Sequence, residues 1–135
     1  MSESIPMRGR YLLDTNIVVA VFNQDLTVAG RLQAGVPSFL SVVTVGELLH
    51  GAYGSQRAVA NVARVNDLAA RMAVLPCETA TAEWYARIKQ RLRTKGRPIP
   101  DNDAWIAATA QQHGLTLVTR DRHFAEIDHL LLETW

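Results

Sequence analysis

The sequence has few of the cysteine and histidine residues with which small proteins form disulfides or structural zinc sites. Cys77 is its only cysteine, which excludes an internal disulfide, and its four histidines show no ligand spacing, which argues against a zinc site. The chain also has no apolar run near membrane length and no leader with a cleavage site in MSESIPMRGR. We therefore expect a cytoplasmic protein with no membrane partner.

The length of the chain predicts one domain. At 135 residues, a single hydrophobic core buries roughly two thirds of the unfolded surface. No linker or internal repeat interrupts the sequence. We predict a single domain over residues 1–135, in which residues 1–9 form a flexible N-terminal extension.

Short apolar runs alternate with longer helical patterns, which is typical of βαβ units around a parallel sheet covered on both faces. The predicted strands are residues 11–13, 38–41, 73–75, 115–119 and, at an edge, 130–132. The predicted helices are residues 15–22, 43–53, 56–72, 79–95 and 102–113, with a short helix at 122–127. The predicted class is α/β with a central parallel sheet of four to five strands.

Four acidic residues stand where apolar runs break: Asp14 in YLLDTN, Glu47 in TVGELLHGA, Asp103 in NDAWIAATA and Asp121 in TLVTRD. Asp14 and Asp121 follow predicted parallel strands, and ligands of open α/β sheets bind at the carboxyl ends of such strands. Clustered carboxylates repel one another, so a raised pKa, a basic partner or a divalent cation must hold them together. Oxygen ligands favour Mg²⁺ or Mn²⁺ over zinc.

Each acid also has a purely structural explanation. Asp14 suits a helix N-cap, and Glu47 completes a T-x-x-E capping box. Asp101 and Asp103 both fall in the first turn of a helix, where the helix dipole favours negative charge. Asp121 suits a polar turn. Taken singly, these explanations are the stronger ones, and only the four contexts together favour a shared site.

Four segments carry a family resemblance, in the order YLLDTN, GELLHGA, GRPIPDNDAWIAATA and LVTRDRHF. From about Tyr11 to Trp135 the chain resembles the PIN-domain ribonucleases and, among them, the VapC toxins of bacterial toxin–antitoxin pairs. The resemblance implies a three-layer α/β/α PIN-like fold, a carboxylate site for Mg²⁺ or Mn²⁺, and hydrolysis of RNA to 5′-phosphate and 3′-hydroxyl ends. It also implies a VapB-like antitoxin partner, a homodimer and a larger hetero-oligomer with the antitoxin.

The resemblance assigns four residues to the catalytic metal site: Asp14, Glu47, Asp103 and Asp121. Asp103 has the family's spacing before Ile106, so we expect Asp101 to be the helix cap instead. We expect Asp14 and Asp103 to be the principal ligands, with the other two acids completing the site and one of them accepting a proton. Asn16 and Thr119 match family positions that orient the acids or hold waters.

Basic residues gather at two places that could contact RNA. Six follow one another without an acid between Trp84 and Pro100: Arg87, Lys89, Arg91, Arg93, Lys95 and Arg97. Arg87 and Arg91 fall on one helix face and are candidate phosphate contacts, although a solvated face explains them equally well. Arg120 and Arg122 flank Asp121 and are candidates for contacts near the scissile bond. Arg120 alternatively braces the carboxylates.

The apolar residues of segment 18–22 and of Leu48, Leu49 and Tyr53 have two explanations. Core packing is the commoner one, and the family resemblance implies a dimer or antitoxin groove. The resemblance also implies that the antitoxin places an arginine among the acids, and the charge of the site favours this.

Two other functional classes are possible alternatives: phosphoaspartyl proteins, which also use acids at strand ends, and binding modules that have no catalytic acids. A phosphoaspartyl phosphatase or receiver domain needs a D-x-D pair or a lysine after a strand, but Asn16 replaces the second aspartate and the only lysines, Lys89 and Lys95, lie in a predicted helix. A noncatalytic binding module would follow if the acids were only caps.

Overall fold

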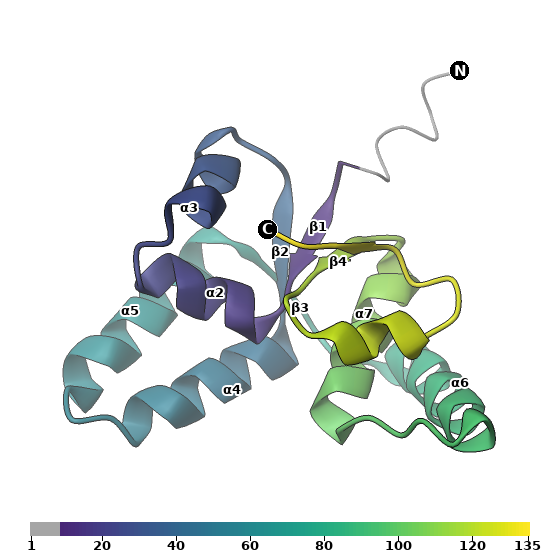
Figure 1. Ribbon diagram of the computed structural model, residues 1–135. Coiled ribbons are helices and arrows are strands. Elements are labelled where there is room, and N and C mark those ends of the chain that lie inside the picture. The colour runs from purple at the N-terminus through teal and green to yellow at the C-terminus, as the bar shows by residue number, and fades with distance from the viewer. Residues whose placement is uncertain (1–8) are drawn as a thin grey trace.

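The computed structural model describes residues 9–135, which form a five-stranded parallel sheet between two layers of helices (Figure 1). The strand order is β3-β2-β1-β4-β5. The strands are β1 (Tyr11–Leu13), β2 (Ser38–Ser41), β3 (Ala73–Leu75), β4 (Thr116–Val118) and β5 (Leu132–Glu133). The predicted three-layer α/β/α class is confirmed. The predicted extension at residues 1–9 lies, apart from Gly9, outside the described residues.

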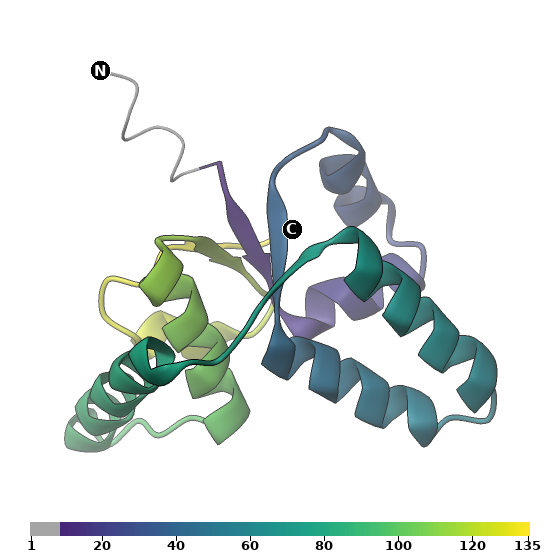
Figure 2. The ribbon, with the colours of Figure 1, turned by 180° about the vertical axis from the view of Figure 1, so that it is seen from behind.

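The helices divide between the two faces of the sheet, as both views show (Figures 1 and 2). One layer contains α2 (Thr15–Phe22), α3 (Leu26–Gln33), α4 (Val42–Tyr53) and α5 (Ala58–Arg71). The other contains α6 (Thr79–Lys95), α7 (Asp101–His113) and the 3₁₀ helix η2 (Arg122–Glu126). Within the described chain, no helix combines the length and the hydropathy needed to cross a bilayer.

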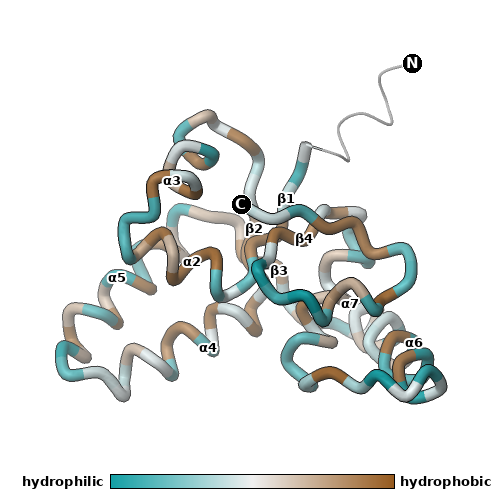
Figure 3. Tube along the Cα trace, in the orientation of Figure 1, coloured by the Kyte–Doolittle hydropathy of each residue, from teal (hydrophilic) through white to brown (hydrophobic). Residues whose placement is uncertain are grey.

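Each layer of helices packs its own hydrophobic core against the sheet. Leu12 and Leu117 face α6 and α7, whereas the next residues along the same strands, Leu13 and Val118, face α2 to α5. Successive side chains of a strand point to opposite faces, so a sheet covered on both faces needs apolar residues at every position. This is why β1 and β3 are apolar throughout, and Figure 3 shows apolar segments in the strands and in the helices of both layers.

The register of β1 and β4 fixes the location of the polar residues that follow them. Leu13 lies opposite Val118, and the Asp14 backbone N–H donates to the Val118 carbonyl at 2.9 Å. Asp14 and Thr119 therefore leave the sheet side by side, and Asp121 follows two residues later. The end of the sheet at which they emerge is the end predicted to bind a ligand.

One helix was missing from the sequence prediction. Helix α3 follows an Asp25 N-cap, whose side chain accepts from the backbone N–H groups of Thr27 and Val28. The helix has only eight residues, and Val28 is its one buried side chain, while Leu26 is 85 % exposed. Besides Val28, the partly buried Leu32 packs against the core, and two such positions are too few to establish a 3.6-residue repeat in the sequence.

Candidate active site

The four predicted acids lie in one pocket. The pocket has a volume of about 390 Å³ and opens at the carboxyl ends of β1 and β4, with α2 and α4 on one side and α7 on the other. Its lining residues are Asp14, Thr15, Asn16, Val19, Glu47, Asp103 and Asp121. Segments more than a hundred residues apart in the sequence thus contribute carboxylates to one space.

Asp14 is the most enclosed of the four acids, with an exposed fraction of 3 %. One carboxylate oxygen accepts from the Thr15 backbone N–H at 2.8 Å, and the other accepts from the Thr119 hydroxyl at 2.7 Å. Burial raises the pKa of Asp14 to about 6, because these two hydrogen bonds only partly offset the loss of solvent and the charges of Asp103 and Asp121 add to the rise. Asp14 is therefore both the cap of α2 and a member of the acidic pocket.

Thr119 and Asn16 form a small polar network behind Asp14. While the Thr119 hydroxyl donates to Asp14, its oxygen accepts from the Asp121 backbone N–H at 3.0 Å and from the Asn16 amide at 3.4 Å. The Asn16 carbonyl oxygen accepts in turn from the Arg120 backbone N–H at 3.3 Å. The two residues thus connect the segments that carry Asp14 and Asp121 and fix the direction of the Asp14 carboxylate.

Glu47 does not form the capping box that its sequence context suggested. Helix α4 begins at Val42 and is capped by Ser41, so Glu47 lies well inside the helix rather than at its third position. Its carboxylate reaches across the pocket instead, where one oxygen accepts from the Thr15 hydroxyl and the other from the Asn102 amide at 3.2 Å. Glu47 is thus held between α2 and α7 by two neutral donors.

Asp101 and Asp103, two residues apart, have different environments. Asp101 was predicted to cap α7, but Pro100 occupies the cap and Asp101 is the first helical residue. The Lys89 ammonium at 2.7 Å holds the pKa of Asp101 below its ordinary value. Asp103 lies in the acidic pocket, and its pKa is raised because burial outweighs the attraction of the nearby His123.

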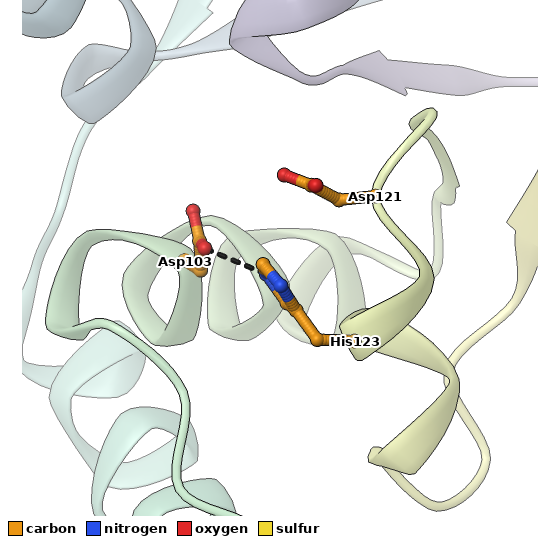
Figure 4. Close-up of side chains that lie close together, drawn as sticks. All are labelled: Asp103, Asp121 and His123. Carbon is orange, nitrogen blue, oxygen red and sulfur yellow. Dashed lines mark ion pairs between the residues drawn. The ribbon is translucent and has the colours of Figure 1, made fainter.

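His123 is a residue of the site that sequence reasoning missed. Its Nε2 lies 2.7 Å from the Asp103 carboxylate, and donor atoms of His123, Asp103 and Asp121 all lie within 4.8 Å of one another (Figure 4). The histidines were judged by their spacing from one another, and no two of them share a site. The sequence feature that could have identified His123 is its position two residues after Asp121 in LVTRDRHF. Helix η2 begins between these two residues and places the His123 side chain close to both Asp121 and Asp103.

The two arginines that flank Asp121 point to other partners or to solvent. The Arg120 guanidinium donates to Asp25 at 2.9 Å and to the Trp135 backbone carbonyl at 3.0 Å, so it does not brace the carboxylates of the pocket. Arg122 is exposed at the start of η2.

The basic stretch on α6 does not line the acidic pocket. Arg87 pairs with Glu83 within the helix, and Arg91 lies in a hollow that also contains Asp128. Lys95 pairs with Asp128 at 2.8 Å, and Lys89 pairs with Asp101. The stretch has no acids of its own, but the fold supplies acids from other segments and so reduces the positive surface expected from the sequence.

The donor set of the pocket fits a divalent cation of the Mg²⁺ or Mn²⁺ type. Neither a lysine nor an arginine is among the residues that line it, so no permanent positive charge compensates the acids there. In addition, the His123 Nε2 is buried 2.7 Å from an Asp103 oxygen and has no hydrogen-bond partner among the described residues. Carboxylate oxygens are the ligands expected of such an ion.

Comparison with known proteins gives consistent matches over nearly the whole chain. The PIN domain family matches residues 11–130. Ribonuclease VapC2 of Haemophilus influenzae is 34% identical over 93% of this chain and 98% of its own length, and the tRNA(fMet)-specific endonuclease VapC of Shigella flexneri is 33% identical over the same shares. The DNA-bound VapBC structure from Salmonella typhimurium superposes with a TM-score of 0.88 at 30% identity, covering 93% of this chain and 98% of the matched one.

Proposed function

The chain belongs to the PIN-domain family and, within it, to the VapC ribonucleases, and from this we propose that it is a divalent-metal-dependent endoribonuclease and the toxin of a toxin–antitoxin pair. One observation carries the proposal: four carboxylates from separate segments meet in a pocket that neither a lysine nor an arginine lines. A phosphodiester can be hydrolysed there only if positive charge enters the pocket, which a divalent cation would provide.

Three aspartates would hold the cation, namely Asp14, Asp103 and Asp121. When bound, a divalent cation lowers the pKa of water and offsets negative charge on the phosphate. Thr119 keeps the Asp14 carboxylate turned into the pocket through its 2.7 Å hydrogen bond, and Asn16 supports Thr119. Such outer contacts orient metal ligands and raise affinity.

Glu47 is the best candidate to accept the proton of the attacking water. It lines the pocket together with the three aspartates. Thr15 and Asn102 hold its two oxygens in place without neutralising its charge. A fixed carboxylate of this kind can orient a water for in-line attack and take its proton, which leaves 5′-phosphate and 3′-hydroxyl ends.

The experiment that tests this function compares two neighbouring aspartates. Purified protein should cleave RNA with Mg²⁺ or Mn²⁺ and stop on addition of EDTA. Asp103→Asn should lower the cleavage rate by about a hundredfold or more, because it removes a metal ligand. The matched variant Asp101→Asn changes the same chemical group outside the pocket and should retain most of the activity. Equal loss in the two variants, or full activity in Asp103→Asn, would contradict the assignment.

The substrate panel for this experiment should contain transfer, ribosomal and messenger RNA. Transfer RNA is included because the relative from Shigella flexneri is described as a tRNA(fMet)-specific endonuclease. Mapping the new 5′ ends of cellular RNA after brief induction would identify the target directly. Cleavage of DNA but not RNA would overturn the proposal.

A VapB-like antitoxin is the proposed protein partner, and an apolar groove next to the acids is its proposed binding site. The groove has a volume of about 330 Å³ and is lined by apolar side chains of three helices: Val19 and Phe22 of α2, Leu48 and Ala52 of α4, and Val65 of α5. It shares Thr15, Val19 and Glu47 with the acidic pocket. An amphipathic segment lying in this groove could therefore also place a basic side chain among the acids.

The phosphoaspartyl alternative does not agree with the family or with the positions of the lysines. A receiver-like site needs a lysine near its aspartates, but Lys89 and Lys95 lie on α6, where they pair with Asp101 and Asp128. No lysine lines the acidic pocket.

A further inference from the structure

His123 presents a nitrogen atom to the same space as two of the acids. Its Nε2 is buried, although 35 % of the side chain is exposed, and the imidazole packs against Phe124 with ring centroids 4.8 Å apart. Phe124 is completely buried in the core beneath α7. The histidine is therefore anchored by its neighbour, and its ring is directed at Asp103 rather than at solvent (Figure 4).

The separations of the donor atoms suit a single bound ion. The Nε2 of His123 and carboxylate oxygens of Asp103 and Asp121 lie within 4.8 Å of one another, and Nε2 is 2.7 Å from the nearer Asp103 oxygen. Ligands at about 2.1 Å from an octahedral ion lie about 3 Å apart when adjacent and about 4.2 Å apart when opposite. Small side-chain rotations would bring all three atoms into this range.

A hydrogen bond to Asp103 does not account for the position of the ring. The two atoms are 2.7 Å apart, but Nε2 forms no hydrogen bond with any of the described residues. A buried polar atom without a partner is costly and calls for a ligand. The in-plane lone pair of a neutral imidazole would meet this need by binding a cation.

We propose that His123 is a direct nitrogen ligand of the divalent cation and that it makes the site selective for Mn²⁺ over Mg²⁺. The inference rests on the proposed metal-dependent function and specifies its cofactor. Mg²⁺ strongly prefers oxygen ligands, whereas imidazole nitrogen binds the later divalent metals increasingly well. Replacement of one oxygen ligand by nitrogen therefore favours Mn²⁺, and Co²⁺ still more.

Pulsed electron paramagnetic resonance of Mn²⁺ bound to the full chain tests this proposal. A directly bonded imidazole nitrogen modulates the spin echo, whereas carboxylate oxygen does not. The native protein should show nitrogen modulation, and His123→Asp, which substitutes an oxygen ligand, should lose it. Calorimetric titration with each metal should give a Mn²⁺-to-Mg²⁺ affinity ratio that falls by about tenfold in the variant.

His50→Asn is the matched control, because His50 lies in a neighbouring hollow that also contains Glu47. This variant should keep the nitrogen modulation. Loss of the signal in His50→Asn, or its persistence in correctly folded His123→Asp, would overturn the proposal. Circular dichroism establishes whether His123→Asp is folded, and the native protein alone is decisive if it is not: bound Mn²⁺ without nitrogen modulation would leave His123 at most an orienting contact of Asp103.

The outcomes separate this inference from the proposed function. RNA cleavage that depends on Mn²⁺, with no nitrogen modulation, would overturn only the role of His123. A native protein that binds neither metal and cuts no RNA would overturn the metal-dependent nuclease itself.

Discussion

At the scale of single residues, one side chain often has both a structural and a chemical role. Asp14 caps α2 through its 2.8 Å hydrogen bond with Thr15 and also belongs to the acidic pocket. The sequence presented these roles as alternatives, but a carboxylate has two oxygens and can serve both. Glu47 and Asp101 behave differently, because the capping expected of each is absent and their carboxylates bind groups on other helices.

The raised pKa of Asp14 predicts how the metal-free protein responds to pH. Its pKa is about 6 in the folded chain, compared with 3.8 in the absence of structure, so the folded state binds the proton more tightly. Protonated Asp14 therefore favours folding below about pH 4, and this contribution is lost as the pH rises through about 6. At pH 7, the charged Asp14 carboxylate lowers the free energy of unfolding by about 2–3 kcal/mol at most.

Asp14→Asn should remove this cost. We expect the free energy of unfolding of the EDTA-treated variant to exceed that of the native protein at pH 7 by about 1–3 kcal/mol, with the difference vanishing toward pH 4. Urea unfolding of both proteins at several pH values measures this difference. The other titratable groups are the same in both proteins, so their contributions cancel in the difference. A variant that is less stable at pH 7 would show that the hydrogen bonds to Thr15 and Thr119 outweigh the cost of burial.

At the scale of elements, the site depends on where helices begin and how strands align. Helix α4 starts one residue before the predicted position, with Ser41 as its cap, and this places Glu47 inside the helix and over the pocket. Helices α2, α4 and α5 together enclose the apolar groove, and Val19 belongs to both the groove and the acidic pocket. The exposed fraction of Val19, 43 %, leaves surface for a partner to cover.

Val19→Gln should weaken binding of the antitoxin by about fivefold to tenfold, since it replaces apolar contact surface by an amide. Val59→Gln is the control, because Val59 is 89 % exposed on α5 and does not line the groove. Titration of each variant with the purified antitoxin measures the effect. Equal affinities of the two variants would place the partner elsewhere.

At the scale of the whole molecule, a bound cation would connect both layers of helices. Asp14 and Glu47 belong to the layer of α2 and α4, and Asp103 belongs to α7 on the opposite face of the sheet. Without an ion, the acids of the two layers repel each other. A ligand that binds only the folded chain stabilises the entire structure by mass action.

Mg²⁺ or Mn²⁺ should therefore raise the melting temperature, by about 5–10 °C at a hundredfold excess over the dissociation constant. Asp14→Asn should abolish most of this shift. Glu47→Gln should retain the shift but lose RNA cleavage, because the proposed role of Glu47 is proton transfer rather than metal binding. An unchanged melting temperature at millimolar ion would favour a noncatalytic module.

Much of the fold was predictable because its signals are local. Unbroken apolar runs such as Tyr11–Leu13 indicate strands buried on both faces, and Gly96 and Gly114 end their helices in the left-handed conformation that favours glycine. Helix α3 was not predictable, because it buries only Val28. The edge strand β5 lies at Leu132–Glu133 rather than at 130–132, since a two-residue strand is set by its pairing with β4 and not by its own sequence.

The sequence by itself determined the types of the elements other than α3, the parallel sheet and the four acids as candidate site residues, because residue periodicity and family motifs are properties of the chain alone. Only the tertiary structure decided that His123 points its Nε2 at Asp103, that Arg120 turns to Asp25, and that Lys89 pairs with Asp101. Such pairings depend on the distances between segments far apart in the sequence. Those distances are fixed when the layers pack against the sheet.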